Sequence, residues 1–229
     1  SRARTLKGIL ELPCFRICGI CPDPDVKSCL EMCSSDSERR DIEGLYQTAA
    51  GNTSSHCVSD FDKCHDKWIS ADKDDSLRLH IFTDGSCLDP RHKFARAGWA
   101  TIFGSDDSNH CACGPLKSTI QTSYRAELRA LAEAVARCKV RYVVKSDCKS
   151  IINQIHRYRR DGRRPTNLPA PHLWNFIFDI LDITPDDFAH FQWIPGHLDS
   201  QEKQKKYKDL LDNGTVTKYD IDGNIAADK

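Results

Sequence analysis

The chain has 229 residues, 39% of them hydrophobic and 29% charged, which is enough apolar material for a folded core and excludes global disorder. Its 33 basic residues balance its 33 acidic ones, which excludes a histone-like basic coat but not a local basic patch. No apolar run reaches the roughly 18 residues that a membrane span needs, and no signal peptide is present. Because the first residue is Ser1 and not Met, we expect a piece of a longer protein. Because no export signal is found, we expect an intracellular location, cytoplasmic or nuclear.

Charge and cysteine content divide the chain near residue 76. Residues 1–76 carry 10 basic and 14 acidic side chains and seven of the twelve cysteines, whereas residues 77–229 carry 23 basic and 19 acidic side chains. The polar segment 70–76 between them is typical of a solvated linker. We therefore predict a Cys-rich, irregular and partly disordered leader or connector over 1–76, followed by a folded domain over 77–229.

Within the second part, hydrophobic patterns predict strands and helices in a definite order. Alternating or short apolar runs predict five strands, at 77–83, 98–104, 110–116, 141–145 and 188–194. Segments of helical composition or spacing predict helices at 124–137, 148–158 and 172–181, with a Gly- and Pro-containing loop at 161–171. The order is three strands, helix, strand, two helices and strand, which is typical of a mixed α/β sheet.

Four carboxylates occupy notable places in this pattern. Asp84 follows the first predicted strand, Asp147 ends the fourth, and Glu127 shares the apolar face of the first predicted helix. Asp228 lies close to the chain end. Taken singly, they could be a turn residue, a helix N-cap, a salt-bridge partner of a neighbouring arginine and a terminal charge. Together they suit Mg²⁺ or Mn²⁺, and two such ions about 4 Å apart recur in phosphodiester cleavage.

Five short motifs resemble those of the ribonuclease H family, type 1. They are TDGS at 83–86, YRAEL at 124–128, SDCKS at 146–150, WIPGH at 193–197 and GNIAAD at 223–228. The resemblance covers the chain from Leu77 onward. It implies a ribonuclease H-like, mixed five-stranded sheet with flanking helices. It also implies an endonuclease that cuts the RNA strand of RNA–DNA hybrids with two Mg²⁺ ions, for which Mn²⁺ can substitute.

The resemblance also implies roles for individual residues. The metal-binding carboxylates would be Asp84, Glu127, Asp147 and Asp228. His197 would be a mobile-loop histidine that assists proton transfer and product release, and the alternative is an ordinary surface histidine. For the whole chain, the alternative is a catalytically weak or inactive module that binds hybrids.

Three departures from the family pattern stand out. The residues after TDGS, 87–93, differ from the usual Gly-Asn-Pro-Gly-like stretch. The loop between His197 and Asp228 is long, and we expect its segment 201–220 to be an exposed polar insertion. Only Lys229 follows Asp228, so we predict a truncated C-terminal helix in which residues 225–229 fray.

A basic cluster at the end of the second predicted helix is the best candidate for phosphate contacts. Its members are Arg157, Arg159, Arg160, Arg163 and Arg164, and Lys149 beside Asp147 is a further candidate. The alternative for the cluster is a solvated helix end. The resemblance places a basic protrusion that grips the DNA strand at this point, so we expect the partner to be an RNA–DNA hybrid.

The leader contains a set of cysteines that could bind Zn²⁺ as a Cys₄ site: Cys18, Cys21, Cys29 and Cys33. An irregular tail with free thiols is the interpretation that we favour, because spacing alone does not fix tetrahedral geometry. Cys-rich connectors also precede ribonuclease H domains in retroelement polyproteins. We therefore expect a monomeric domain that is attached to a reverse transcriptase in its parent chain.

Overall fold

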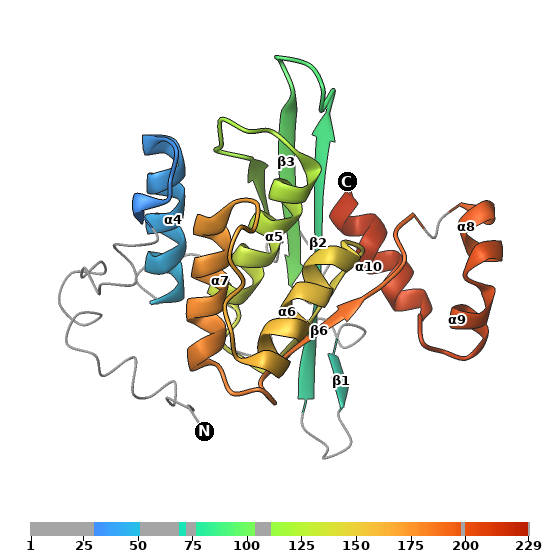
Figure 1. The fold of residues 1–229 in the computed structure, drawn as a ribbon. Coiled ribbons are helices and arrows are strands. Elements are labelled where there is room, and N and C mark those ends of the chain that lie inside the picture. The colour runs from blue at the N-terminus through green and yellow to red at the C-terminus, as the bar shows by residue number, and fades with distance from the viewer. Residues whose placement is uncertain (1–29, 51–68, 72–76, 104–110, 198–199, 229) are drawn as a thin grey trace.

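The computed structural model describes residues 30–50, 69–71, 77–103, 111–197 and 200–228 (Figure 1). Its centre is a mixed sheet with five main strands in the order β4-β3-β2-β5-β6. These strands are β2 (Leu77–Leu88), β3 (Arg96–Phe103), β4 (Cys111–Pro115), β5 (Tyr142–Ser146) and β6 (Ala189–Trp193). A short strand β1 (Ile69–Ala71), at the start of the predicted linker, pairs with the beginning of β2. The predicted mixed five-stranded α/β sheet is confirmed.

The connections follow the predicted order. Strands β2, β3 and β4 form an antiparallel meander, after which β5 pairs parallel to β2 and β6 pairs parallel to β5. Helix α5 (Ser123–Arg137) precedes β5, and α6 (Lys149–Asp161) and α7 (Pro171–Ile183) connect β5 to β6. Parallel neighbours need such crossover connections, whereas antiparallel ones need only a short loop.

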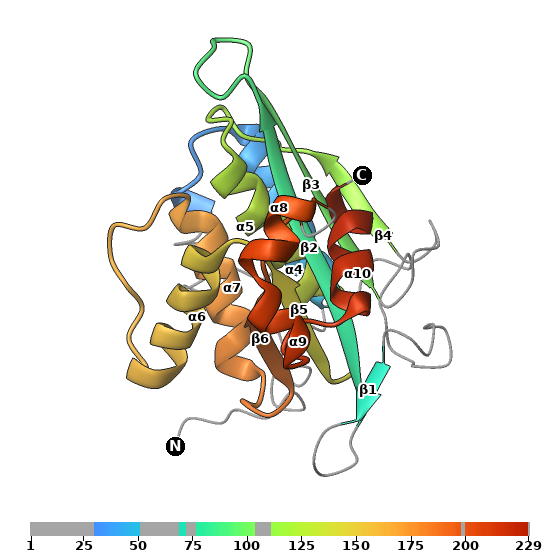
Figure 2. The same ribbon diagram turned by 90° about the vertical axis from the view of Figure 1, so that its right-hand side faces the viewer.

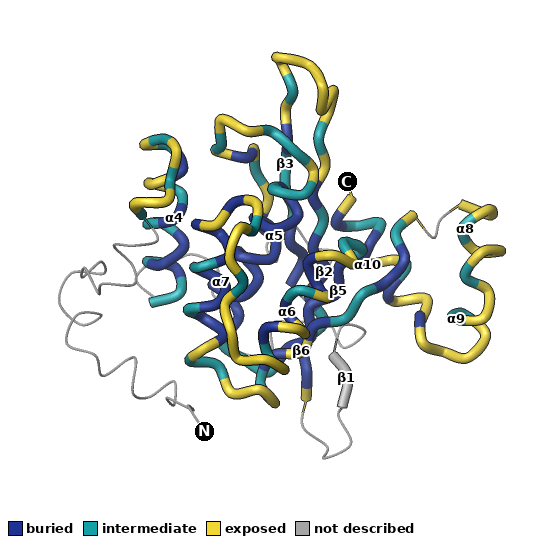
Figure 3. The backbone as a smooth tube through the Cα atoms, viewed as in Figure 1, coloured by how far each residue is buried: buried dark blue, intermediate teal, exposed yellow. Residues whose placement is uncertain are grey.

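Helices cover both faces of the sheet (Figures 1 and 2). Helices α5, α6 and α7 bury their apolar sides against one face and form the main core. Helix α10 (Lys218–Asp228) lies on the opposite face over a much smaller apolar cluster. Helices α8 (Gln201–Lys206) and α9 (Lys208–Asp212) have no buried residue and lie beside α10 at the rim (Figure 3). No helix within the described ranges is long and apolar enough to cross a membrane.

Strand β2 carries side chains to both faces because successive side chains alternate. Leu79 and Ile81 belong to the main core. Phe82 belongs instead to the small cluster under α10. Two residues after Phe82, Asp84 therefore lies on the α10 face of β2.

Helix α4 (Asp36–Ala49) lies in the part of the chain that the sequence analysis predicts to be irregular, and for these residues that prediction is wrong. Ser35 caps the helix by accepting a hydrogen bond from the backbone N–H of Glu38. Ile42, Leu45 and Tyr46 are buried in the main core with α5 and α7. The sequence signal for this helix is Ser35-x-x-Glu38, the pattern of a capping box. It was missed because the rest of the helix is largely polar.

Ion pairs fix α4 to α5. Arg125 bonds Glu38 at 3.1 Å, and Arg129 bonds Asp41 at 2.6 Å and Glu133 at 2.7 Å. Glu133, six residues after Glu127 on α5, is thus buried and paired. Its partner Arg129 is also buried and is shared with Asp41, so removing the Arg129 charge would leave two acids with less compensation.

Because α4 completes the core, we predict that Leu45→Ala lowers the free energy of unfolding by about 2 to 5 kcal/mol. The side chain is 1% exposed, so its removal leaves a cavity between α4 and the sheet-covering helices. Urea denaturation measures the change, with the exposed Arg40→Ala on the same helix as control. Equal stability of both variants would show that α4 does not contribute to the folded unit.

Candidate active site

The parallel pairing of β2 with β5 places two acidic residues side by side. The last pair in register is Thr83 with Ser146, and Asp84 and Asp147 are the next residues along the chain. They therefore meet at the point where β5 ends. The sequence analysis places Asp84 after its strand, but β2 continues to Leu88 because β3 still pairs with it there.

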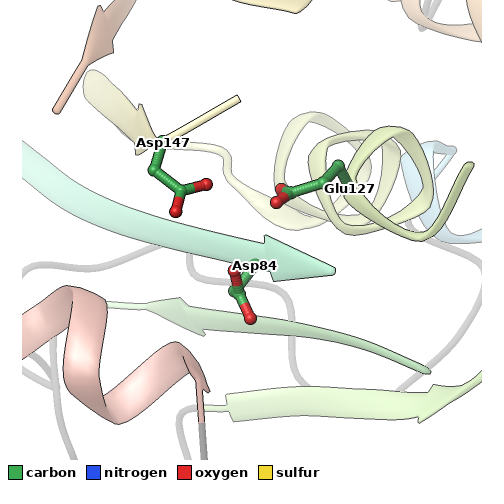
Figure 4. Close-up of side chains that lie close together, drawn as sticks. All are labelled: Asp84, Glu127 and Asp147. Carbon is green, nitrogen blue, oxygen red and sulfur yellow. The ribbon is translucent and has the colours of Figure 1, made fainter. Parts of the chain in front are cut away.

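Helix α5 supplies a third acidic residue to the same place. A Cβ atom at Gly85 would overlap the backbone of Glu127, so glycine is required for β2 and α5 to approach this closely. Asp84, Glu127 and Asp147 each offer a carboxylate oxygen within 4.8 Å of the other two (Figure 4). We call these three residues the carboxylate cluster.

Among the residues that the structure describes, no arginine serves as counter-ion to Glu127. Arg125 is engaged by Glu38 and Arg129 by Asp41, so the salt bridge considered from the sequence is not formed. Glu127 is only 7% exposed, and its Oε2 atom has no hydrogen-bond partner among the described residues. A buried carboxylate in this state raises the free energy of the fold unless a cation or a donor meets it.

Asp147 is supported through its backbone and its close surroundings. The indole Nε1–H of Trp193 donates a 2.9 Å hydrogen bond to the backbone oxygen of Asp147. A Cβ atom at Gly196 would overlap the Asp147 carboxylate, so the loop after β6 closes over this side chain. The N-cap of α6 is Cys148, so Asp147 does not cap this helix as the alternative interpretation required.

Burial and mutual repulsion raise the pKa values of two members of the cluster. Burial, and then the charges of Asp147 and Asp228, raise the pKa of Asp84 to about 6. Burial, and then the charges of Asp147 and Asp84, raise the pKa of Glu127 well above its usual range. The ionised cluster is thus unfavourable in the protein alone.

The donor set fits a divalent cation. The cluster offers carboxylate oxygens without Cys or His, which is the ligand chemistry that Mg²⁺ and Mn²⁺ prefer. A cation would also give the buried Oε2 of Glu127 a partner and would offset the repulsion between the three charges.

Asp228 and His197 lie together beside the cluster. Asp228 is the last residue of α10, and its Oδ2 lies 3.7 Å from Nδ1 of His197. The backbone N–H of His197 donates to Oδ1 of Asn224, a residue that the sequence analysis did not single out although it lies in GNIAAD. The prediction that 225–229 frays is wrong for 225–228, because the helix is built from residues that precede Asp228.

Residues 77–212 match the sequence profile of the RNase H family. The chain belongs to the RNase H family. The match includes the carboxylate cluster and His197 and ends at Asp212. Asp228 lies beyond it and is placed near the cluster by α10.

Several solved structures are similar to parts of the chain. LC11-RNase H1, solved in complex with an RNA/DNA hybrid, has 17% identity, a TM-score of 0.38, and coverage of 58% of this chain and 94% of that one. The PFV RNase H domain has 19% identity, a TM-score of 0.44, and coverage of 65% and 88%. The foamy viral protease-reverse transcriptase, in complex with RNA/DNA hybrid, has 18% identity, a TM-score of 0.42, and coverage of 60% and 20%. No curated protein sequence matches the chain.

The predicted basic cluster of this RNase H domain divides into two groups. Arg159 bonds the backbone oxygen of Ala189, and Arg164 lies 2.6 Å from carboxylates of both Asp179 and Asp182. These two guanidinium groups are therefore engaged within the fold. The remaining three, Arg157, Arg160 and Arg163, are exposed, and among them Arg160 pairs with its sequence neighbour Asp161 at 2.8 Å.

Two other predicted sites have different outcomes. Lys149 lies in the first turn of α6, with its Nζ 4.9 Å from the ring centre of Trp193, and so it is close to Asp147.

Cys18, Cys21 and Cys29 of the possible zinc site lie outside the described residues. Cys33 is half-buried, and burial followed by the charge of Glu38 raises its pKa to about 11.

The raised pKa of Asp84 predicts a dependence of stability on pH when metal is absent. Its folded-state pKa of about 6 exceeds the ordinary 3.8, so the folded state binds the proton more tightly. The resulting stabilisation is full below pH 3.8 and is lost as the pH rises through about 6. At pH 7 in EDTA, Asp84→Asn should therefore raise the free energy of unfolding by about 1 to 3 kcal/mol.

Urea denaturation at pH 4 and pH 7 measures this effect, with the exposed Asp222→Asn as control. At pH 4 the Asp84→Asn variant should differ much less from the unsubstituted protein. A gain of the same size at both pH values would contradict the explanation by charge repulsion.

Proposed function

We propose that this chain is an endonuclease that hydrolyses the RNA strand of RNA–DNA hybrids. The observation that carries the proposal is the carboxylate cluster of Asp84, Glu127 and Asp147 in a member of the RNase H family. A module that only binds a polyanion gains nothing from three close acids, which repel phosphate. The raised pKa values of Asp84 and Glu127 are typical of functional sites, where chemistry and not folding explains an unfavourable arrangement.

We further propose that Asp84, Glu127, Asp147 and Asp228 hold two Mg²⁺ ions, with Mn²⁺ as a substitute. When bound, such ions activate water and stabilise charge on the phosphorus centre and the leaving oxygen. The protein's part is to hold the ligand oxygens in place. Glu127 is held by a helix packed into the main core, and Asp147 by the indole of Trp193.

His197 is suited to move a proton at the edge of this site. It is 64% exposed, and its Nδ1 lies 3.7 Å from Oδ2 of Asp228. Its Nε2 would then give or accept the proton of the reacting or leaving oxygen. The residue has a φ of 56°, a conformation that is uncommon for residues other than glycine and fits a specialised loop position.

A catalytically weak, hybrid-binding module is the second candidate. One observation favours it: Asp228 is half-exposed and is not among the three acids whose oxygens lie within 4.8 Å of one another. Activity in Mg²⁺ separates the two candidates, because both would bind the hybrid but only one would cleave it.

For an enzyme, Asp147→Asn should reduce cleavage at least about 100-fold, because loss of a metal ligand costs several kcal/mol at the transition state. The measurement uses a hybrid with labelled RNA in Mg²⁺, beside duplex DNA and duplex RNA. Asp222→Asn is the matched control, since it removes an exposed carboxylate. A variant that keeps more than about a tenth of the rate would contradict the assignment.

The divided arginine cluster predicts two different phenotypes. Replacing Arg157, Arg160 and Arg163 with Ala should lower the slope of log affinity against log salt by about 0.9 for each lost phosphate contact. Replacing Arg159 and Arg164 should instead lower stability, because these two bond groups of the fold. Binding is measured with the Asp147→Asn protein to prevent cleavage. An unchanged slope in the triple variant would show that the exposed arginines do not face the hybrid.

A further inference from the structure

A buried ion pair beneath α10 has no part in the chemistry proposed above. Lys145 lies on β5, two residues before Asp147, and its Nζ bonds Oδ1 of Asp220 in the first turn of α10. The two side chains are 6% and 1% exposed. The sequence analysis assigns Asp220 to an exposed insertion, and for this residue that expectation is wrong.

The pair is part of a network that fixes the start of α10. The second oxygen of Asp220, Oδ2, accepts hydrogen bonds from the backbone N–H of Thr217 at 2.8 Å and from its hydroxyl at 3.0 Å. The backbone N–H of Asp220 donates in return to the Thr217 hydroxyl oxygen at 3.3 Å. On the other side, Nζ of Lys145 lies 5.9 Å from the ring centre of Phe82. One carboxylate thus joins the helix start to the sheet.

Helix α10 has little else to hold it. Its buried residues are Asp220, Gly223, Asn224 and Ala227, none of which has a large apolar side chain. Gly223 lies so close to the ring of Phe82 that a Cβ atom would overlap it, which brings the helix near the sheet but adds little apolar area. The usual apolar stripe of a surface helix is therefore replaced by a polar anchor.

A buried ion pair is poorly explained by stability. The cost of desolvating both charges often equals or exceeds their attraction, and replacement by apolar residues is frequently neutral or stabilising. The pair instead provides geometric specificity. Its short contacts form only when α10 has one position and one register on the sheet. Asp228 lies eight residues further along the same helix, about 12 Å away at 1.5 Å per residue.

We propose that Lys145 and Asp220 are positioning residues that fix the register of α10 and thereby hold Asp228 and His197 beside the carboxylate cluster. Asp228 depends on α10 directly, and His197 depends on it through its hydrogen bond to Asn224. This inference rests on the proposed function in one respect: it assigns Asp228 a share in metal binding.

The test is the double variant Lys145→Met/Asp220→Leu, which removes both charges together and leaves neither unpaired. Asp222→Ala is the control, because it removes an exposed carboxylate from the same helix. Three measurements are made: thermal unfolding, amide hydrogen exchange, and Mg²⁺ binding to the metal-free protein by calorimetry. The Mg²⁺ concentration for half-maximal cleavage of a hybrid is a fourth.

We expect the double variant to keep its melting temperature within a few degrees. Amides of 221–228 should exchange at least about tenfold faster while those of α5 are unchanged, because only α10 loses its anchor. The dissociation constant for the weaker Mg²⁺ and the half-maximal Mg²⁺ concentration should each rise about fivefold or more. The control should match the unsubstituted protein in all four measurements.

Unchanged Mg²⁺ binding in a folded double variant would overturn the proposal, whether or not exchange of α10 is faster. If the double variant does not fold, Asp220→Asn replaces it, since the amide oxygen can still accept from Thr217 while the charge is lost. Failure of the proposed function is recognised separately. In that case the unsubstituted protein cleaves no hybrid, and calorimetry and hydrogen exchange still decide whether the pair positions α10.

Discussion

This structure depends on one constraint, which is the mutual repulsion of the acidic groups in the partly buried carboxylate cluster. Asp84, Glu127 and Asp147 would separate if their backbones allowed it. They are kept together by parallel register between β2 and β5, and by two glycines at which any side chain would collide. Asp84 lies on β2, Glu127 on α5, and Asp147 directly after β5, so elements packed into the core oppose the repulsion, together with the loop that contains Gly196.

The supports on the two faces of the sheet are of different kinds. On one face, α5 is held by a large apolar core and by α4, which the ion pairs of Arg125 and Arg129 fix in place. On the other face, α10 has a small apolar contact and relies on polar contacts. Glu127 of the cluster thus depends on the well-packed face, whereas Asp228 and the neighbouring His197 lie at an exposed edge on the other.

The sequence was sufficient for what is encoded locally. The five main strands and helices α5, α6 and α7 were predictable from apolar patterns and composition, and the grouping of three acids from motifs that follow strands or lie on an apolar helix face. What could not be predicted depends on partners far along the chain. Asp220 looks like one more charge in a polar loop until Lys145, 75 positions away, is brought beneath it. Arg159 and Arg164 likewise look free until β6 and α7 supply their partners. Helix α4 was missed because its signal is a cap and a few apolar residues in a polar segment.

The carboxylate cluster also determines which substitutions the protein would accept if it were no longer selected for the proposed activity. Neutral replacements at Asp84 or Glu127 relieve repulsion or supply a missing hydrogen bond, so at these positions folding and activity favour opposite residues. In the main core, folding and activity favour the same residues, because large-to-small changes there lower stability and with it activity. A copy released from selection on activity, but still selected to stay folded, would therefore accumulate its first substitutions at the acids.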